Sequence, residues 1–340
     1  MESGRKRQRG PEVATRARRV VVRHLSAIGQ ALFAYNPWVG LAGIIILAVA
    51  APHLAVTGLL VSVLARLVAS AVGAPATFLG TGLAELNGWF LGLACGTFFA
   101  VGLGLAAAVL LGGVIVALLS ITMHRVLATW DVPLVIGPYV PTFWILWGGL
   151  TATAWTRAAV LPSVPPAPDS PLLLVLVGGL RGVGQIFFLP NAEAGVALAV
   201  AASIVDIYLG VAMIAASVAA VGIGYLAGLP LWQVETGLAG FTAALIAAAA
   251  RCRFAGIGWL AVTITVVTIP FVEAAALKIG SAVGVHALSA PYVALIWIFA
   301  LLRPAASSGS DSGRTSSSNA GGGDWPAGRR PRIFGEARAE

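Results

Sequence analysis

Long runs of hydrophobic residues, broken at only a few points by polar ones, fill this chain between residues 25 and 302. A helix needs about 20 apolar residues to cross the hydrocarbon core of a bilayer, and several of these runs are that long. The pattern predicts apolar elements near residues 38–52, 54–74, 86–119, 132–158, 171–189, 194–226, 236–250, 255–276 and 284–302. The run at 86–119 is long enough for more than one element.

The composition assigns the chain to the integral membrane proteins. Of its 340 residues, 59% are hydrophobic and 10% are charged, whereas about a quarter of the residues in a soluble domain are charged. The mean hydropathy of +0.92 points the same way. We therefore predict an all-α integral membrane protein.

The net charge of +8 lies at the two ends of the chain. Residues 1–24 hold eight of the 21 Lys and Arg, and residues 303–340 hold six more, while the region between them carries seven basic and seven acidic residues. Basic segments that flank apolar spans set topology and attract anionic lipid. We expect membrane lipid and no nucleic acid as a partner, an inner (cytoplasmic) membrane location, both termini cytoplasmic, and an even number of spans.

The chain divides into five segments by composition. Several prolines mark residues 156–171 as a connector, and the Ser/Gly-rich end has too little apolar surface to order itself. The prediction is a basic cytoplasmic tail at 1–24, membrane repeats at 25–155 and 172–302, the connector at 156–171 between them, and a disordered tail at 303–340.

The two membrane segments repeat each other. Three blocks recur in the same order at spacings of 155, 155 and 153 residues: Gln30, Phe33, Asn36 and Gly40 as Gln185, Phe188, Asn191 and Gly195; Thr81–Ala84 as Thr236–Ala239; and Pro138-Tyr139 as Pro291-Tyr292. Such order and spacing imply two structurally equivalent halves.

Charge also predicts how the halves are related. The connector is poor in basic residues and suits an external loop, so each half should contain an odd number of spans, which we take as five. An odd number inverts the second half relative to the first and creates a solute site between the repeats. We expect re-entrant or broken helices that line a central pore.

Catalytic and metal-binding motifs are missing from the sequence. The four histidines and two cysteines lack the spacing of a metal site, and no Ser/His/Asp arrangement or phosphate-binding loop is present, so we predict no enzyme and no cofactor. Carboxylates in apolar stretches are costly and usually functional. Asp206 and Glu235 read as residues of helix ends, while Glu85 stands out because it adjoins a repeated block.

The repeated residues suit a pore for a small neutral polar molecule. A polar group stripped of water costs about 4–8 kcal/mol in hydrocarbon, so the walls must return hydrogen bonds. Gln30 with Phe33, and Gln185 with Phe188, offer an amide and a flat aromatic face at three-residue spacing, which places both on one face of a helix. The plainer interpretation is that Gln bonds between helices and Phe faces lipid.

These motifs resemble those of the urea transporters. The first-half signature, Gly-Gln, then Phe, then Asn-Pro-x-x-Gly, is matched by Gly29 to Gly40. A second block is matched loosely by residues 82–92 and 237–247, and a third by 130–139 and 286–292. The resemblance covers nearly everything from residue 28 to 302. It implies a channel-like homotrimer with one pore in each subunit and urea or a similar small amide as the permeant.

The resemblance also implies site residues. Gln30, Phe33 and Leu86 would line one mouth of the slot, and Gln185, Phe188 and Phe241 the other. Further substrate-binding residues would be Asn87, Phe90, Ile136, Leu245 and Ser289.

The sequence departs from the family pattern at several of these positions. Ile136 and Ser289 stand where the family has two threonines, so one hydroxyl of the acceptor ladder is lost. Leu86 replaces an aromatic residue, Thr242 stands for the counterpart of Asn87, and Glu85 replaces a glycine. These changes leave a small neutral amide, with urea as one member, as the expected solute.

Two other channel classes fit the sequence poorly, and two further functions stay open. Asn36-Pro37 suggests a water channel, but the halves are too long for three spans each. An ammonium channel would need paired pore histidines, and no two histidines are repeat-equivalent. A proton-coupled transporter could use a membrane-embedded carboxylate such as Glu85, and a membrane scaffold would carry no flux.

Overall fold

The structure is a computed structural model that describes residues 18–160 and 170–302. The predicted tails before residue 18 and after residue 302, and the centre of the predicted connector, lie outside the described residues. Residues 18–24, which the sequence assigned to the N-terminal tail, belong to the first helix, Arg18–Leu32.

The first half of the described chain is a series of helices. The helix Arg18–Leu32 ends in the 3-10 turn η1 (Gln30–Leu32). It is followed by α2 (Pro37–Ala50), α3 (Pro52–Ala71), α4 (Ala76–Thr81), α5 (Leu83–Phe98), α6 (Leu103–Ala128) and α7 (Tyr139–Thr151). The long predicted run at 86–119 therefore contains parts of two helices, α5 and α6.

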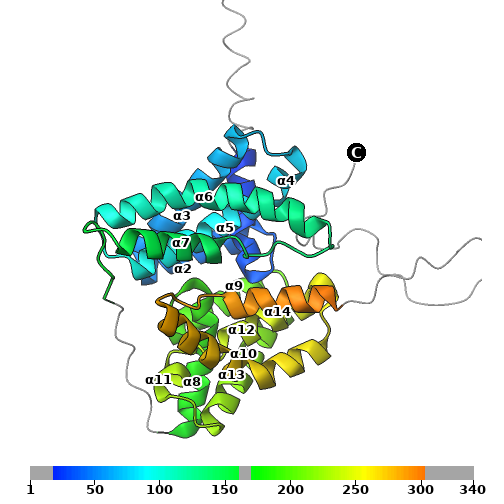
Figure 1. Cartoon of the computed structure of the whole chain (residues 1–340). Coiled ribbons are helices and arrows are strands. Elements are labelled where there is room, and N and C mark those ends of the chain that lie inside the picture. The colour runs from blue at the N-terminus through cyan, green and yellow to red at the C-terminus, as the bar shows by residue number, and fades with distance from the viewer. Residues whose placement is uncertain (1–17, 161–169, 303–340) are drawn as a thin grey trace, which may run out of the picture.

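The second half repeats this series. Its elements are α8 (Pro171–Gly184), η2 (Gln185–Phe187), α9 (Ala192–Ser203), α10 (Ile207–Leu226), α11 (Leu231–Glu235), α12 (Phe241–Arg251), η3 (Phe254–Gly256), α13 (Trp259–Val283) and α14 (Ala290–Leu301). The first residues of η1, α2, α3 and α4 recur 155 residues later as those of η2, α9, α10 and α11. In Figure 1 the helices α2–α7 form one group and α8–α14 a second group beside it.

Backbone conformations are duplicated together with the helices. Phe33 and Phe188 both adopt the left-handed region, with φ of 57° and 60°, directly after their 3-10 turns. Gly82 and Gly237 do so as well, with φ of 75° and 78°, at the start of the second repeated block. The sequence repeat thus encodes local backbone geometry, because glycine adopts this region without the cost that a side chain adds.

A sharp bend opens each half. The helix Arg18–Leu32 meets α2 at 75°, and the helix 171–187 meets α9 at 68°. At each bend a repeated asparagine caps the second helix: Asn36 Oδ1 accepts a hydrogen bond from Trp38 N at 2.8 Å, and Asn191 Oδ1 accepts one from Ala194 N at 2.7 Å. These caps satisfy backbone donors that a helix start would otherwise leave free.

The repeated glycine after each bend is required by close backbone packing. A Cβ atom on Gly40 would overlap the carbonyl oxygen of Leu25, and one on Gly195 would overlap that of Leu180. Both glycines therefore let the two arms of a bent pair approach more closely than any larger residue allows. The repeated Asn and Gly serve the bend rather than the solute.

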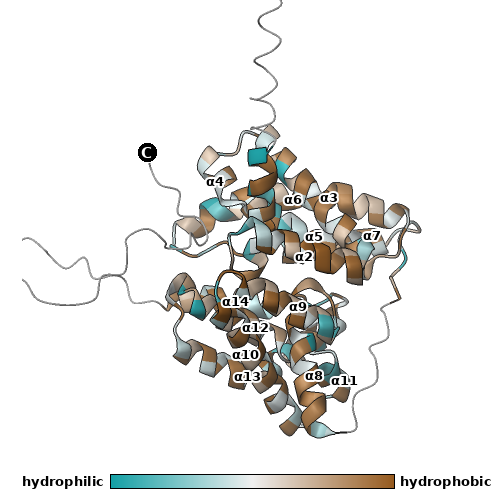
Figure 2. Ribbon diagram, turned by 180° about the vertical axis from the view of Figure 1, so that it is seen from behind, coloured by the Kyte–Doolittle hydropathy of each residue, from teal (hydrophilic) through white to brown (hydrophobic). Residues whose placement is uncertain are grey.

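Within residues 18–160 and 170–302, four helices are long and apolar enough to cross a membrane, namely α3, α6, α10 and α13. The count rises to six if each bent pair is one span. Two shorter apolar helices among the described residues, α12 and α14, pack against α13. Hydrophobic residues dominate the long helices (Figure 2), and large apolar side chains such as those of Val49 and Leu67 face outward. In the described residues, the prediction of an all-α membrane protein is confirmed.

Reciprocal hydrogen bonds join the two halves. Trp144 Nε1 donates to the carbonyl oxygen of His286 at 2.7 Å, and Trp297 Nε1 donates to that of Pro133 at 3.0 Å. Donors and acceptors are each 153 residues apart, so each half gives the other the same contact. This exchange is characteristic of a two-fold relation between equivalent units.

Candidate functional site: a pocket between the two halves

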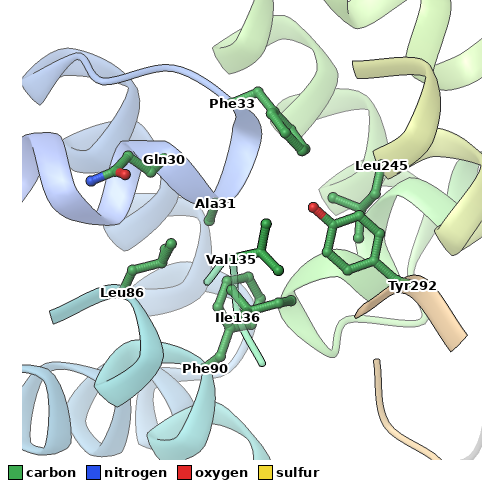
Figure 3. A pocket seen from close by; sticks show the side chains of 9 residues that line it. All are labelled: Gln30, Ala31, Phe33, Leu86, Phe90, Val135, Ile136, Leu245 and Tyr292. Carbon is green, nitrogen blue, oxygen red and sulfur yellow. The ribbon is translucent and has the colours of Figure 1, made fainter. Parts of the chain in front are cut away.

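A narrow pocket lies where the two halves meet. Seven of its lining residues belong to the first half and two to the second, and all nine are uncharged: Gln30, Ala31, Phe33, Leu86, Phe90, Val135, Ile136, Leu245 and Tyr292. Figure 3 shows them converging from the first bend, from α5, from the segment before α7, and from α12 and α14. The pocket is narrow, with room for about one buried water.

Six of the eleven predicted site residues line this pocket, namely Gln30, Phe33, Leu86, Phe90, Ile136 and Leu245. The sequence analysis did not select Ala31, Val135 or Tyr292, which also line it. For Tyr292 a signal was present, since it belongs to the repeated Pro-Tyr block.

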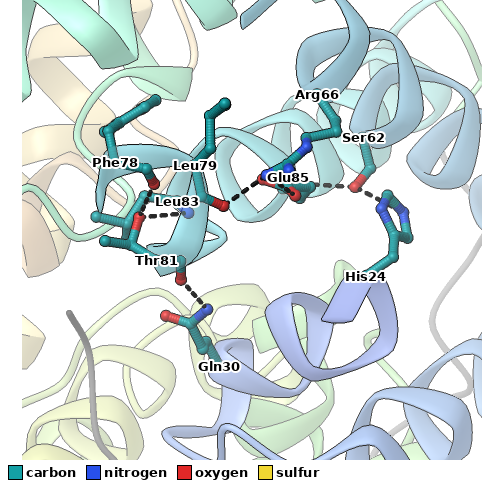
Figure 4. Close-up of polar contacts among 9 residues, drawn as sticks. All are labelled: His24, Gln30, Ser62, Arg66, Phe78, Leu79, Thr81, Leu83 and Glu85. Carbon is teal, nitrogen blue, oxygen red and sulfur yellow. Dashed lines mark hydrogen bonds and ion pairs between the residues drawn. The ribbon is translucent and has the colours of Figure 1, made fainter. Parts of the chain in front are cut away.

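Gln30 forms a structural hydrogen bond as well as lining the pocket. Its Nε2 donates to the carbonyl oxygen of Thr81 at 2.8 Å (Figure 4), and the repeat-equivalent Gln185 Nε2 donates to that of Thr236 at 3.0 Å. Within the described residues, the buried Gln30 Oε1 has no hydrogen-bond partner. The amide nitrogen is therefore engaged, and the oxygen is the part of Gln30 left for another donor.

The expected placement of Gln30 and Phe33 on one helical face is wrong. Gln30 begins a 3-10 turn, and Phe33 follows that turn in the left-handed conformation. Because the chain leaves the helix there, the Phe33 side chain is redirected and meets the ring of Phe254 edge-on, with 5.5 Å between centroids. Both residues still line the same pocket.

Asn87 holds the wall of the pocket without lining it. Its Nδ2 donates to the carbonyl oxygens of Leu83 and Val135, each at 2.9 Å, and its Oδ1 accepts from Tyr139 N at 3.2 Å. Val135 has a φ of 44°, a strained value for a β-branched residue. The amide thus fixes the segment that presents Val135 and Ile136 to the pocket.

Ser289 lies outside the pocket lining and is bonded to Tyr139. The Tyr139 hydroxyl donates to Ser289 Oγ at 2.6 Å and accepts from Ser289 N at 3.1 Å. Tyr139 also stacks on Phe90, with 5.6 Å between ring centroids. The second-half hydroxyl that the sequence offered as a ladder acceptor is therefore partly used by the protein itself.

The other predicted second-half residues lie outside this pocket. Phe188 meets Phe98 edge-on at 6.3 Å, and Phe98 stacks on the ring of His286 at 3.9 Å, so these three rings form an aromatic cluster. Phe241 is the buried first residue of α12. At the counterpart of Asn87, Thr242 Oγ1 donates to the buried Glu273 carboxylate at 2.5 Å.

Glu85 is neutralised by an ion pair away from the pocket lining. Arg66 Nη1 lies 3.1 Å from Glu85 Oε1 and also donates to the carbonyl oxygen of Leu79 (Figure 4). Ser62 Oγ donates to the Glu85 carbonyl oxygen at 2.8 Å and contacts His24 Nε2 at 3.2 Å. The ion pair with Arg66 therefore gives the Glu85 carboxylate a structural role.

Two further carboxylates lie at helix ends, as the sequence indicated. Asp206 caps α10 by accepting from Tyr208 N at 3.0 Å, and it pairs with Arg251 at 2.6 Å. Glu235 is the last residue of α11, and its carbonyl oxygen accepts from Arg181 Nη1 at 3.0 Å. Neither lines the pocket.

Comparison with protein families identifies the class of protein. The family model described as "Urea transporter" matches residues 21–304, which is most of the chain. The chain therefore belongs to the urea transporter family, and the resemblance noted in the sequence is confirmed. Comparison with curated proteins gives no match. Membership of this family supports urea transport across a membrane by a transporter rather than an enzyme.

Proposed function

We propose that this protein is a passive, channel-like facilitator for urea or a similar small neutral amide, which crosses through the pocket between the two halves. The observation that carries the proposal is the uncharged lining of that pocket, contributed by both repeats. A site for a coupling ion would need a charged or titratable group on the path, whereas Glu85 is paired with Arg66 away from it.

The chemistry of the pocket suits a dehydrated flat solute, and its space, which holds about one water, must widen for an amide to pass. Its narrow space excludes hydrated ions, whose dehydration costs tens of kcal/mol, while a neutral amide loses only about 4–8 kcal/mol of hydration. The Phe33 and Phe90 rings offer flat apolar faces, and the Gln30 and Tyr292 side chains offer polar atoms. The wall can therefore replace part of the lost hydration without binding the solute tightly.

The path would continue into the second half through the repeat-equivalent residues. Gln185, Phe188 and Phe241 stand where Gln30, Phe33 and Leu86 stand in the first half, and the aromatic cluster around Phe188 would form the second mouth. Asn87 and Ser289 would act as supports for the wall.

The arrangement in the membrane is part of the proposal. The reciprocal tryptophan hydrogen bonds support a two-fold relation between halves, and an axis in the membrane plane would invert one half relative to the other. Five spans per half would require the shorter helices to cross as well. The basic ends support an inner-membrane location with both termini in the cytoplasm. The family resemblance supports a homotrimer.

The test is solute flux into vesicles that contain the purified protein. Stopped-flow light scattering with urea, formamide, acetamide and glycerol should show rapid entry of urea and slower entry as the solute grows. Ala31 lines the pocket with a small side chain, so Ala31→Phe should block urea entry while Ala42→Phe, at a partly buried position outside the lining, should not. Equal urea entry in wild type and Ala31→Phe would refute this path.

A further inference from the structure

Tyr292 brings a hydroxyl group into the pocket. Its surroundings differ from those of its repeat counterpart, Tyr139. Tyr292 lies in the first turn of α14, is 3% exposed and lines the pocket together with Ile136 and Leu245. Figure 3 shows its hydroxyl directed between Phe33 and Val135. Within residues 18–160 and 170–302, this hydroxyl has no hydrogen-bond partner.

The repeat-equivalent tyrosine is in the opposite situation. Tyr139 donates its hydroxyl proton to Ser289 Oγ and accepts from the Ser289 backbone N–H. The Tyr139 hydroxyl is engaged as both donor and acceptor in this contact between the halves, and neither Tyr139 nor Ser289 lines the pocket.

A single residue difference removes the side-chain acceptor that Tyr292 would otherwise have. The two tryptophan hydrogen bonds between the halves are reciprocal, with donors and acceptors 153 residues apart. By the same relation, the counterpart of the contact between Tyr139 and Ser289 would join Tyr292 to residue 136. Residue 136 is Ile, whose side chain has no acceptor. Because Ile136 has no hydroxyl, the Tyr292 hydroxyl lacks the side-chain partner that Ser289 gives to Tyr139.

We propose that the Tyr292 hydroxyl is the group that exchanges hydrogen bonds with a passing solute at this point, and that it determines selectivity for amides there in place of Ser289. A phenol donates its O–H to a carbonyl oxygen and accepts from an amide N–H. One side chain can thus serve either end of an amide while Val135, Ile136 and Leu245 remain apolar. This inference rests on the proposed transport function.

The first test removes the hydroxyl alone. In proteoliposomes, Tyr292→Phe should reduce urea entry about tenfold, which corresponds to about 1.4 kcal/mol in the barrier. Tyr225→Phe is the matched control, because Tyr225 is a partly buried second-half tyrosine that packs near Leu174, away from the pocket. It should leave urea entry unchanged.

The second test restores a partner for Tyr292. Ile136→Thr should bind the Tyr292 hydroxyl as Ser289 binds Tyr139, and should slow urea entry in the wild-type background. In the Tyr292→Phe background the same substitution should accelerate it, because the threonine hydroxyl is then free. A role in packing alone would not reverse the sign of the effect.

The outcomes separate this inference from the proposed function. Wild-type protein without urea entry above that of empty vesicles would overturn both. Wild-type entry that is equal in Tyr292→Phe would overturn the inference alone. If Tyr292→Phe does not assemble, Ile136→Thr decides: slower urea entry supports the inference, and unchanged or faster entry overturns it.

Discussion

Replacing Arg66 by methionine should destabilise the protein, because it leaves a buried carboxylate without its counter-charge. The Glu85 side chain is 2% exposed and the Arg66 side chain 24% exposed, with 3.1 Å between Arg66 Nη1 and Glu85 Oε1. Removing one partner of a fully buried pair costs about 3–5 kcal/mol. Partial solvation of Arg66 reduces the expected loss to about 2–3 kcal/mol.

The double variant Arg66→Met/Glu85→Gln should recover most of that stability. Both charges are then absent, and methionine replaces the arginine stem by an unbranched apolar side chain. The second half supports this expectation, since Val221 and Gly240 occupy the equivalent positions without any charge. Glu85→Gln alone should cost less than Arg66→Met, because Arg66 still reaches solvent.

The assay is thermal unfolding of the purified protein in detergent, followed by size-exclusion chromatography after heating, with urea entry measured in parallel. A loss of about 2–3 kcal/mol should lower the midpoint by about 4–12 °C. A double variant as unstable as Arg66→Met would refute the pairing argument. A stable Glu85→Gln variant without urea entry would instead show that this carboxylate acts in transport.

Two further predictions concern the support of the pocket and the bend. Asn87→Ala leaves the Val135 carbonyl and a backbone N–H unpaired, so it should cost about 2 kcal/mol or more in thermal unfolding and slow urea entry; destabilisation without slower entry would contradict the role of Asn87 as a support. Gly40→Ala should sharply reduce the yield of folded protein because its methyl group meets the Leu25 carbonyl oxygen, whereas Gly80→Ala, with open space around it, should not; equal yields would contradict the packing argument.

The repeat was readable from the sequence because its residues obey local rules. Asn36 and Asn191 cap helices, and Gly82 and Gly237 adopt left-handed conformations, so each must recur wherever the backbone repeats. The hydrophobic runs predicted the helices because a membrane-spanning helix needs a continuous apolar stretch. They did not give boundaries such as the one between α5 and α6, where apolar residues continue across the break.

The contacts of the pocket could not be read in the same way. Tyr292 and Ile136 are distant in sequence. The sequence alone does not show that Tyr139 bonds to Ser289 while Tyr292 has no such partner. The bend at Gln30 was misjudged because three-residue spacing does not distinguish a helix from a 3-10 turn followed by a left-handed residue. The ion pair of Arg66 and Glu85 joins separate helices, and its existence depends on packing.

The most direct test of the central claim is urea entry into vesicles with and without an imposed proton gradient. An uncharged passage between the repeats predicts that the rate depends on the urea gradient alone and is unchanged by a protonophore or by membrane potential. Accumulation of urea against its own gradient, lost on addition of the protonophore, would contradict the account.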